Sequence, residues 1–325
     1  MNILKPLFGI TLLCFFTSLY AAEIQTIEKE LVYIVPDTRI EFWEIMARGV
    51  QNKADSLGYA LEVYISHNDA KTELQSVAKA LKERVAGVII SPTTSSACAT
   101  ILKLAKKKNI PVVISDIGSE GDEYVSYISS NNKEGAYKLG KILAKKLIEL
   151  GFNDGRVGII AIPQKRLNGQ ARTAGFMQAM DEANIKGADI KQQSTWSEEE
   201  TYTFSKEMIE AYPDLRAIWL QGSDRYKGAL RAIAHAGKKG EILLLTFDAE
   251  PEFLELIPSG VVVASAMQQP YLMGQEAVLA MDKHLRGEAL EKNIQLPILA
   301  ISAENIEQML PIIKKNVLGI EKIKK

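Results

Sequence analysis

The chain has 325 residues, which is enough for two domains of ordinary size, because single hydrophobic cores stop growing at about 250 to 300 residues. Lysine and arginine total 39 against 40 aspartate and glutamate residues, so the formal net charge of -1 provides no broad attraction for nucleic acid or anionic lipid. Hydrophobic residues at 47% and charged residues at 24% are typical of a globular protein and exclude a disordered chain.

The N-terminal segment predicts export. It reads MNILKPLFGITLLCFFTSLYAAE, with one early lysine, an apolar run from about Leu7 to Phe16, and small residues before the first acidic residue. This pattern is typical of a secretory signal peptide, and the apolar run is too short for a stable membrane span. We therefore predict that residues 1–22 are cleaved and that the mature protein is periplasmic. A retained N-terminal anchor is the alternative.

From residue 31 onward, short β-branched segments alternate with amphipathic segments. The first series reads LVYIV, a helix to about Gly58, ALEVYIS, the helix KTELQSVAKALKERV, AGVIIS, the helix SACATILKLAKKKN, and IPVVISD. The strand segments lack the alternation of a half-exposed sheet. They therefore predict parallel strands buried on both faces, with the helices as crossovers.

After EYVSYISSNN the pattern begins again with the long helix KEGAYKLGKILAKKLIELG. The second series then reads GRVGIIAI, a helix over about 170–183, ADIKQQ, EEETYTFSKEMIEAYP, LRAIWLQG, DRYKGALRAIAHAG, EILLLTFD, GVVVASAMQQP and YLMGQEAVLAMDKHLRG. Two successive series predict an α/β fold of two doubly wound, Rossmann-like parallel-sheet lobes. The join at residues 129–132 is short and polar, which predicts a hinge rather than a loose tether.

Polar and aromatic residues follow the carboxyl ends of these strands, where ligands bind in open parallel sheets. In the first series they are Asp37, Arg39, Phe42, Trp43, Pro92, Thr93 and Asp116. In the second series they are Gln164, Asn168, Gln170, Arg172, Gln221, Ser223, Asp224, Asp248 and Gln268. Carboxylates and amides supply partners for hydroxyl groups, and an aromatic face covers the C–H side of a ring. The set therefore predicts a polyhydroxylated ligand.

At these residues the chain resembles the periplasmic sugar-binding protein family of the ribose- and galactose-binding type, which has the type I periplasmic binding protein fold. The resemblance runs from about Leu31 to Ala300. It rests on the first strand followed by FW, GVIISPT followed by IPVVISD, QARTAGF, WLQGSDRYKGALRA, LLLTFDAEP and ASAMQQP. It implies two lobes that close over a small ligand in the cleft between them.

The resemblance also implies three hinge strands, with crossings near Ser130, Gln268 and Ala300. These crossings predict a division of the mature chain into two discontinuous lobes. The predicted N-terminal lobe has residues 23–130 and 269–300, and the predicted C-terminal lobe has residues 131–268 and 301–325.

Carried over residue by residue, the resemblance implies that Phe42 and Trp43 stack on the ligand and that Asp116 binds its hydroxyls from the first lobe. Arg172 or the neighbouring Gln170 would bind a ring oxygen or hydroxyl from the second lobe. The complete set of candidate ligand-binding residues is Asp37, Arg39, Phe42, Trp43, Asp116, Gln170, Arg172, Trp196, Ser223, Asp224, Asp248 and Gln268.

Three positions depart from the family pattern. Ile117 stands where members often have an arginine, and GSD replaces the usual Asn-Asp, so both Ser223 and Asp224 remain candidates. Arg39 adds a cation that a simple monosaccharide site does not require. These departures leave room for a less usual polyol, an acidic or amino sugar, a furanosyl compound or a small osmolyte.

No motif for catalysis, metal binding or a cofactor is present. The three histidines lack the spacing of a metal pair, and no phosphate-binding glycine loop occurs. After cleavage Cys98 would be the only cysteine, which excludes an intramolecular disulfide, and it is interpreted as a small core residue.

We therefore predict a monomeric receptor, not an enzyme, without cofactor, metal or nucleic acid. Its partner would be the permease of an ABC sugar importer or the periplasmic domain of a sensor kinase, for transport or for chemosensing. The alternative is an α/β enzyme acting on a sugar, although the candidate carboxylates lie in different lobes with no motif linking them. The effector half of a repressor is disfavoured by the export signal and the missing DNA-binding helices.

Overall fold

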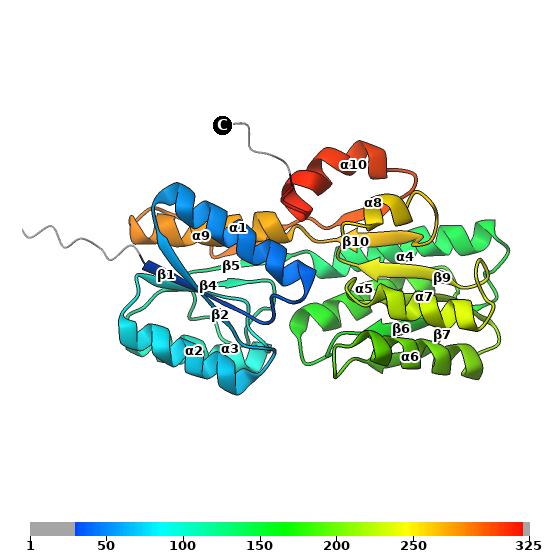
Figure 1. Cartoon of the computed structure of the whole chain (residues 1–325), viewed down its shortest axis with the longest axis horizontal. Coiled ribbons are helices and arrows are strands. Elements are labelled where there is room, and N and C mark those ends of the chain that lie inside the picture. Colours follow the sequence, from blue (N-terminus) through cyan, green and yellow to red (C-terminus); the bar gives the residue numbers. More distant parts are fainter. Residues whose placement is uncertain (1–29, 321–325) are drawn as a thin grey trace, which may run out of the picture.

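The computed structural model describes residues 30–320 and has two α/β lobes, arranged end to end along the long axis of the molecule (Figure 1). Each lobe contains a six-stranded, mostly parallel sheet, so the predicted fold class is confirmed. The predicted signal peptide, residues 1–22, lies outside the described residues. Among residues 30–320, no helix combines the length and the apolar character that crossing a membrane would need.

The sheet of the first lobe is parallel throughout, in the order β11-β5-β4-β3-β1-β2. Its strands are β1 (Glu30–Val35), β2 (Ala60–Ile65), β3 (Gly87–Ile90), β4 (Val112–Ser115), β5 (Ser126–Ser130) and β11 (Asn293–Leu296). Its helices are α1 (Glu41–Leu57), α2 (Ala70–Glu83), α3 (Ser95–Lys107) and α9 (Pro270–Leu285).

The apolar sequence of β1 explains how this lobe is layered. Leu31, Tyr33 and Val35 pack into a core cluster with side chains of α1 and α9, whereas Val32 and Ile34 pack on the opposite face with α2 and α3. Because successive side chains of a strand point to opposite faces, a strand with five consecutive buried apolar or aromatic residues needs helices on both sides.

The sheet of the second lobe has the order β12-β10-β9-β8-β6-β7, and β12 is antiparallel to β10. Its strands are β6 (Arg156–Ala161), β7 (Lys186–Gln192), β8 (Leu215–Leu220), β9 (Leu243–Phe247), β10 (Ala264–Met267) and β12 (Leu299–Ser302). Its helices are α4 (Asn132–Glu149), α5 (Leu167–Glu182), α6 (Glu198–Ala211), α7 (Tyr226–His235), α8 (Phe253–Leu256) and α10 (Ile306–Ile312), followed by a π-helical turn, η1 (Ile313–Val317).

The chain passes between the sheets at three places: after β5, between β10 and α9, and between β11 and β12. Hydrogen bonds link the crossings, from the Asn131 backbone N to the Leu296 O at 3.0 Å and from Gln269 Nε2 to the Pro297 O at 2.8 Å. The third crossing differs from the prediction, because β12 of the second sheet already begins at Leu299. Pro297 lacks an N–H group and so ends the β11 ladder three residues before Ala300, the crossing predicted from the sequence.

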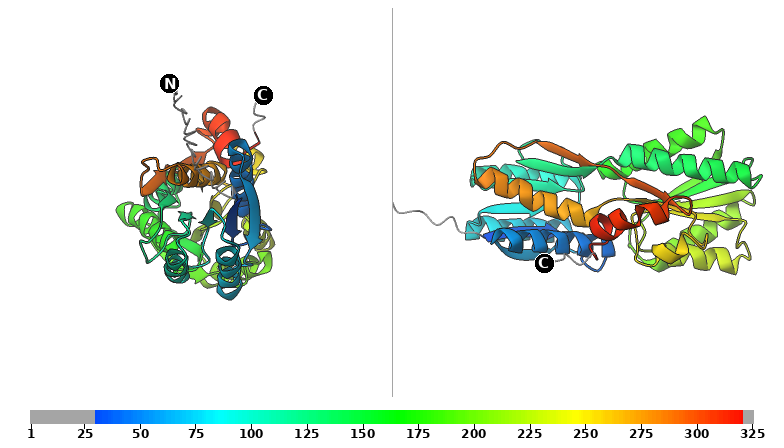
Figure 2. Two further views of the ribbon diagram at one scale, coloured as in Figure 1. Left: turned by 90° about the vertical axis from the view of Figure 1, so that its left-hand side faces the viewer. Right: turned by 90° about the horizontal axis from the view of Figure 1, so that it is seen from above.

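The C-terminal segment, predicted to belong wholly to the second lobe, also contacts the first. Figure 2 shows α10 above the junction of the two lobes. Arg48 of α1 donates through Nη2 to the Leu318 O at 2.5 Å, and Asn316 donates to Gln269 Oε1 at 2.8 Å. The segment 306–320 therefore lies across the hinge, while residues 321–325 are outside the described chain.

Candidate functional site

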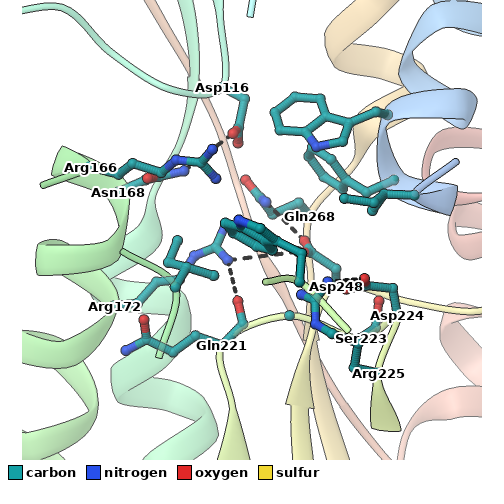
Figure 3. A pocket seen from close by; sticks show the side chains of 16 residues that line it. Asp116, Arg166, Asn168, Arg172, Gln221, Ser223, Asp224, Arg225, Asp248 and Gln268 are labelled. Atoms are coloured by element: carbon teal, nitrogen blue, oxygen red, sulfur yellow. Dashed lines mark hydrogen bonds and ion pairs between the residues drawn. The ribbon is translucent and has the colours of Figure 1, made fainter. Parts of the chain in front are cut away.

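A pocket lies between the lobes, at the carboxyl ends of strands from both sheets (Figure 3). It has about 430 Å³ of space unoccupied by protein atoms, including space open to solvent. Its walls combine aromatic, amide and charged side chains, and they consist of Ile40, Phe42, Trp43, Asp116, Ile162, Arg166, Asn168, Arg172, Trp196, Gln221, Gly222, Ser223, Asp224, Arg225, Asp248 and Gln268.

Most of the residues predicted from the sequence line this pocket. They are Phe42, Trp43, Asp116, Arg172, Trp196, Ser223, Asp224, Asp248 and Gln268. The structure thus brings together side chains that are up to 226 positions apart in the sequence (Phe42 to Gln268, 268 − 42). Each of them lies in the loop that follows a strand or near the start of the helix after that loop, at the carboxyl edge of a sheet, where ligands bind in open parallel sheets.

Asp37 and Arg39 do not line the pocket. They pair with each other instead, because Arg39 Nε lies 2.9 Å from Asp37 Oδ1 and Nη2 lies 2.6 Å from Oδ2. The hydrogen bonds from Arg39 hold the pKa of the Asp37 carboxyl below its usual value. The Arg39 side chain is 77% exposed, whereas the Asp37 side chain is 7% exposed, so the pair joins a buried carboxylate to a guanidinium at the surface.

The structure separates the two candidates on α5. Arg172 is buried in the pocket wall, whereas Gln170 is exposed and donates through Nε2 to the Gln164 O at 2.8 Å. Residues four apart lie on the same face of a helix, so Asn168 and Arg172 face the pocket together. Gln170 is two residues from each and therefore points away.

Phe42 and Trp43 form the aromatic wall of the first lobe. They lie in the first turn of α1, with their ring centroids 4.8 Å apart at an interplanar angle of 84°. This edge-to-face arrangement is favourable between aromatic rings and fixes both against the core. Trp196 lies in the turn before α6, and its ring is close to the guanidinium groups of Arg166 and Arg225, at 4.9 and 4.8 Å.

Arg172 and Asp248 form the centre of a network in the second lobe. Arg172 Nη1 lies 3.7 Å from Asp248 Oδ2 and donates to the Gln221 O at 2.6 Å, while Nε donates to Asn132 Oδ1 at 2.8 Å. Gln268 Nε2 donates to Asp248 Oδ1 at 2.8 Å. Burial raises the pKa of Asp248 to about 6, although Arg172 and Gln268 act in the opposite direction.

Asp116 is the carboxylate that the first lobe contributes. Asn168 of the second lobe donates through Nδ2 to Asp116 Oδ2 at 3.2 Å, whereas the buried Oδ1 has no hydrogen-bond partner among residues 30–320. Burial raises the pKa of Asp116, opposed by the charges of Arg172 and Arg166. Asp116 and Asp248 both adopt left-handed backbone angles, with φ of 62° and 70°. Such angles are uncommon for residues other than glycine and recur at ligand sites.

Arg166 and Arg225 line the pocket but were not predicted from the sequence. Asn168 and Gln221 also line it; their positions after strands were recognised, but they were not in the candidate set. Both arginines also follow strands, β6 and β8, so the same rule could have found them. Arginine in a loop is ordinarily exposed, but Arg166 is 6% and Arg225 is 4% exposed here. Arg225 pairs with Asp224, and its Nε has no partner among the described residues.

The described residues contain no group of three or more histidine, cysteine, aspartate or glutamate side chains placed to hold a metal ion. Cys98 of α3 is fully buried in the core that α2 and α3 form with the first-lobe sheet, and burial raises the pKa of its thiol to about 12. A thiol in this state is inert, which agrees with its interpretation as a core residue.

Known proteins share this architecture. Residues 31–289 match the family model described as periplasmic binding protein domain. The ribose import binding protein of Haemophilus influenzae is 31% identical over 261 residues, which cover 80% of this chain and 87% of that protein. The D-apiose import binding protein of Actinobacillus succinogenes is 26% identical over 259 residues, which cover 79% and 82%.

Among solved structures, a carbohydrate transporter solute binding protein from Agrobacterium radiobacter, in complex with D-arabinose, has a TM-score of 0.82 at 21% identity. The match covers 89% of this chain and 98% of that one and shows the shared fold. The family-model match, the relatives and the interlobe pocket lead to one conclusion. The chain belongs to the type I periplasmic sugar-binding protein family, and it is a binding protein rather than an enzyme.

Proposed function

We propose that this protein binds a neutral monosaccharide, or a related polyol or furanosyl compound, between its lobes. The observation that carries the proposal is the pocket itself, where an aromatic pair from one lobe faces amides and ion-paired charges from the other. Such a wall suits a small ring with a C–H side and several hydroxyl groups.

The balance of charge in the pocket favours a neutral ligand. The guanidinium groups of Arg166, Arg172 and Arg225 are matched by an equal number of carboxylates, from Asp116, Asp224 and Asp248. Direct pairing links Arg172 with Asp248 and Arg225 with Asp224. Since no surplus of either sign faces the ligand, an acidic or amino sugar would bring in an unmatched charge at high desolvation cost.

Unpaired polar atoms indicate where hydroxyl groups would bind. Asp116 Oδ1 and Gln268 Oε1 are buried acceptors, and Arg225 Nε is a buried donor, all without a partner among residues 30–320. Buried polar atoms are nearly always hydrogen-bonded in proteins. A polyol that donates to the two acceptors and accepts from the guanidinium would satisfy all three.

We further propose that the mature protein is a periplasmic monomer and that it delivers its sugar to the permease of an ABC importer. The relatives described as import binding proteins support the importer. The N-terminal sequence of secreted protein tests cleavage after residue 22, and chemical cross-linking to co-expressed membrane components distinguishes a permease from a sensor kinase.

Native mass spectrometry of freshly purified protein, followed by calorimetry with a panel of neutral, acidic and amino sugars, tests the ligand class. We expect one neutral sugar bound per chain and no affinity for its uronic acid or amino analogue. Binding of only a charged sugar would overturn the charge argument. Turnover of any sugar would restore the enzyme alternative.

A further inference from the structure

One side chain crosses from the second lobe to the first beside the pocket. Arg166 lies in the loop between β6 and α5, and its Nε donates to the Thr93 O at 3.1 Å while its Nη2 lies 3.2 Å from Asn68 Oδ1. Both acceptors belong to loops that follow first-lobe strands. Both hydrogen-bond acceptors of the guanidinium therefore lie across the cleft from its own lobe.

The two residues after Arg166 extend the contact. The Leu167 backbone N lies 3.5 Å from Ser95 Oγ, and Asn168 reaches Asp116 of the first lobe. The beginning of α5 therefore makes a continuous polar contact with three loops at the carboxyl ends of first-lobe strands. Figure 3 shows Arg166 and Asn168 pointing toward Asp116.

A side chain of the first lobe holds Thr93, one of the two acceptors of Arg166, in place. Glu73 of α2 is fully buried and accepts from the Thr93 backbone N at 2.5 Å and from Thr93 Oγ1 at 3.3 Å. These bonds hold Thr93 in position, and above its raised pKa of about 7 the Glu73 carboxyl also adds a negative charge near the Arg166 guanidinium. The buried Glu73 carboxyl thus fixes Thr93, and the Thr93 carbonyl accepts from the Arg166 guanidinium. The acceptor is therefore held in place before the lobes meet, unlike a chance contact between two surfaces.

We propose that Arg166 is a latch that holds the two lobes closed, through its hydrogen bonds to Thr93 and Asn68 on the opposite lobe. Opening the cleft must break these bonds together. The Trp196 ring lines the pocket and also lies beside the Arg166 guanidinium. The side chain that forms the latch therefore also contacts the aromatic wall of the pocket. This proposal rests on the proposed function, a receptor whose two lobes close over a sugar. The hydrogen bonds of the latch themselves join only protein atoms.

The latch therefore makes a prediction for the protein without sugar: part of the population is closed. Spin labels on cysteines replacing exposed Lys82 of α2 and Lys206 of α6 would report the distance between the lobes by pulsed electron paramagnetic resonance. Cys98 is fully buried and can stay. We expect two distance populations for the wild type.

Two variants remove the latch from opposite sides. Arg166→Gln removes the cation, and Asn68→Gly removes one acceptor without strain, because Asn68 has a φ of 57° that glycine adopts freely. Each should lower the ratio of closed to open molecules by about fivefold or more, the effect of one net charge-assisted hydrogen bond. Lys165→Gln, the exposed neighbour, removes a charge without touching the latch and should change nothing.

These measurements separate a latch from other roles. An entirely open wild type, or an unchanged distance distribution in Arg166→Gln, would overturn the proposal. An effect of Arg166→Gln with no effect of Asn68→Gly would also overturn it and assign Arg166 a role within its own lobe. The labelled protein is unfolded, dialysed and refolded beforehand to remove any retained sugar, and none is added. Failure of the proposed ligand class therefore leaves the result readable. Where D-ribose binds, the latch also predicts a faster dissociation rate in both variants with little change in the association rate.

Discussion

The two lobes contribute to the pocket in different ways. The first lobe presents the aromatic pair Phe42 and Trp43 and one carboxylate, Asp116, whose partner Asn168 comes from the other lobe. The second lobe presents polar groups that are already bonded among themselves around Arg172 and Asp248. Because the polar side chains of the second lobe are already held in place, they can bind sugar hydroxyls without losing further conformational freedom. We therefore expect a sugar to bind the second lobe first and the first lobe to close over it.

The largest expected effect follows from the second lobe. Asp248→Ala should weaken sugar binding by about 2 to 4 kcal/mol, because it leaves Arg172 and Gln268 buried without their shared partner. It should also lower the melting temperature without sugar, since the network exists in the lobe itself. Calorimetry and thermal unfolding measure the two effects. Asp214→Ala, which breaks an exposed ion pair of the same lobe, is the matched control. An affinity loss no greater than that of the control would mean that the pocket is not the sugar site.

Asp116→Asn should weaken sugar binding by about 1 to 2 kcal/mol, which is less than Asp248→Ala, because the amide keeps one acceptor for a ligand hydroxyl. Its melting temperature without sugar should stay close to that of the wild type, since Asp116 has its partner across the cleft rather than inside its lobe. If Asp116→Asn destabilised the unliganded protein as much as Asp248→Ala, the contrast between the lobes would be wrong.

Stability without sugar should fall as pH rises from about 5 to 8. Burial is the main cause that raises the pKa of Glu73 to about 7, of Asp248 to about 6 and of Glu250 to about 8. A carboxyl with a raised pKa binds its proton more tightly in the folded state, so this contribution to stability is complete below the unfolded pKa and is lost as pH rises through the folded value.

Variants assign the pH effect to a lobe. Glu73→Gln should remove the part of the pH dependence that ends at about pH 7, through the first lobe, and Glu250→Gln the part that continues to about pH 8, through the second. Thermal unfolding across this pH range, with the exposed Glu210→Gln as control, measures both. A stability that rises with pH over this range would contradict the assignment.

The smallest effect is expected for Arg39→Ala and Gln170→Ala. Neither side chain lines the pocket, and both are exposed. Each should change sugar affinity by less than about twofold, because exposed polar contacts contribute little. A tenfold loss for either variant would show that the sugar site extends beyond the pocket, toward the residues first predicted from the sequence.

The sequence by itself determined the fold class and much of the candidate site. The run LVYIV of β1, residues 31–35, requires helices on both faces of its sheet. The order of strands and helices places the residue after each strand at one edge. Asp116 and Asp248 could be chosen in this way because a strand end is visible within a few residues of sequence.

Only the tertiary structure decided which charges are buried and where the lobes meet. Buried Arg166 hydrogen-bonds to a loop of the other lobe, and the C-terminal segment 306–320, which lies across the hinge, accepts a hydrogen bond from Arg48 of α1. Local sequence encodes secondary structure through short-range periodicity, whereas the burial of a polar group depends on surfaces that fold from distant parts of the chain. For that reason the strand-end residues were predictable and the contacts across the cleft were not.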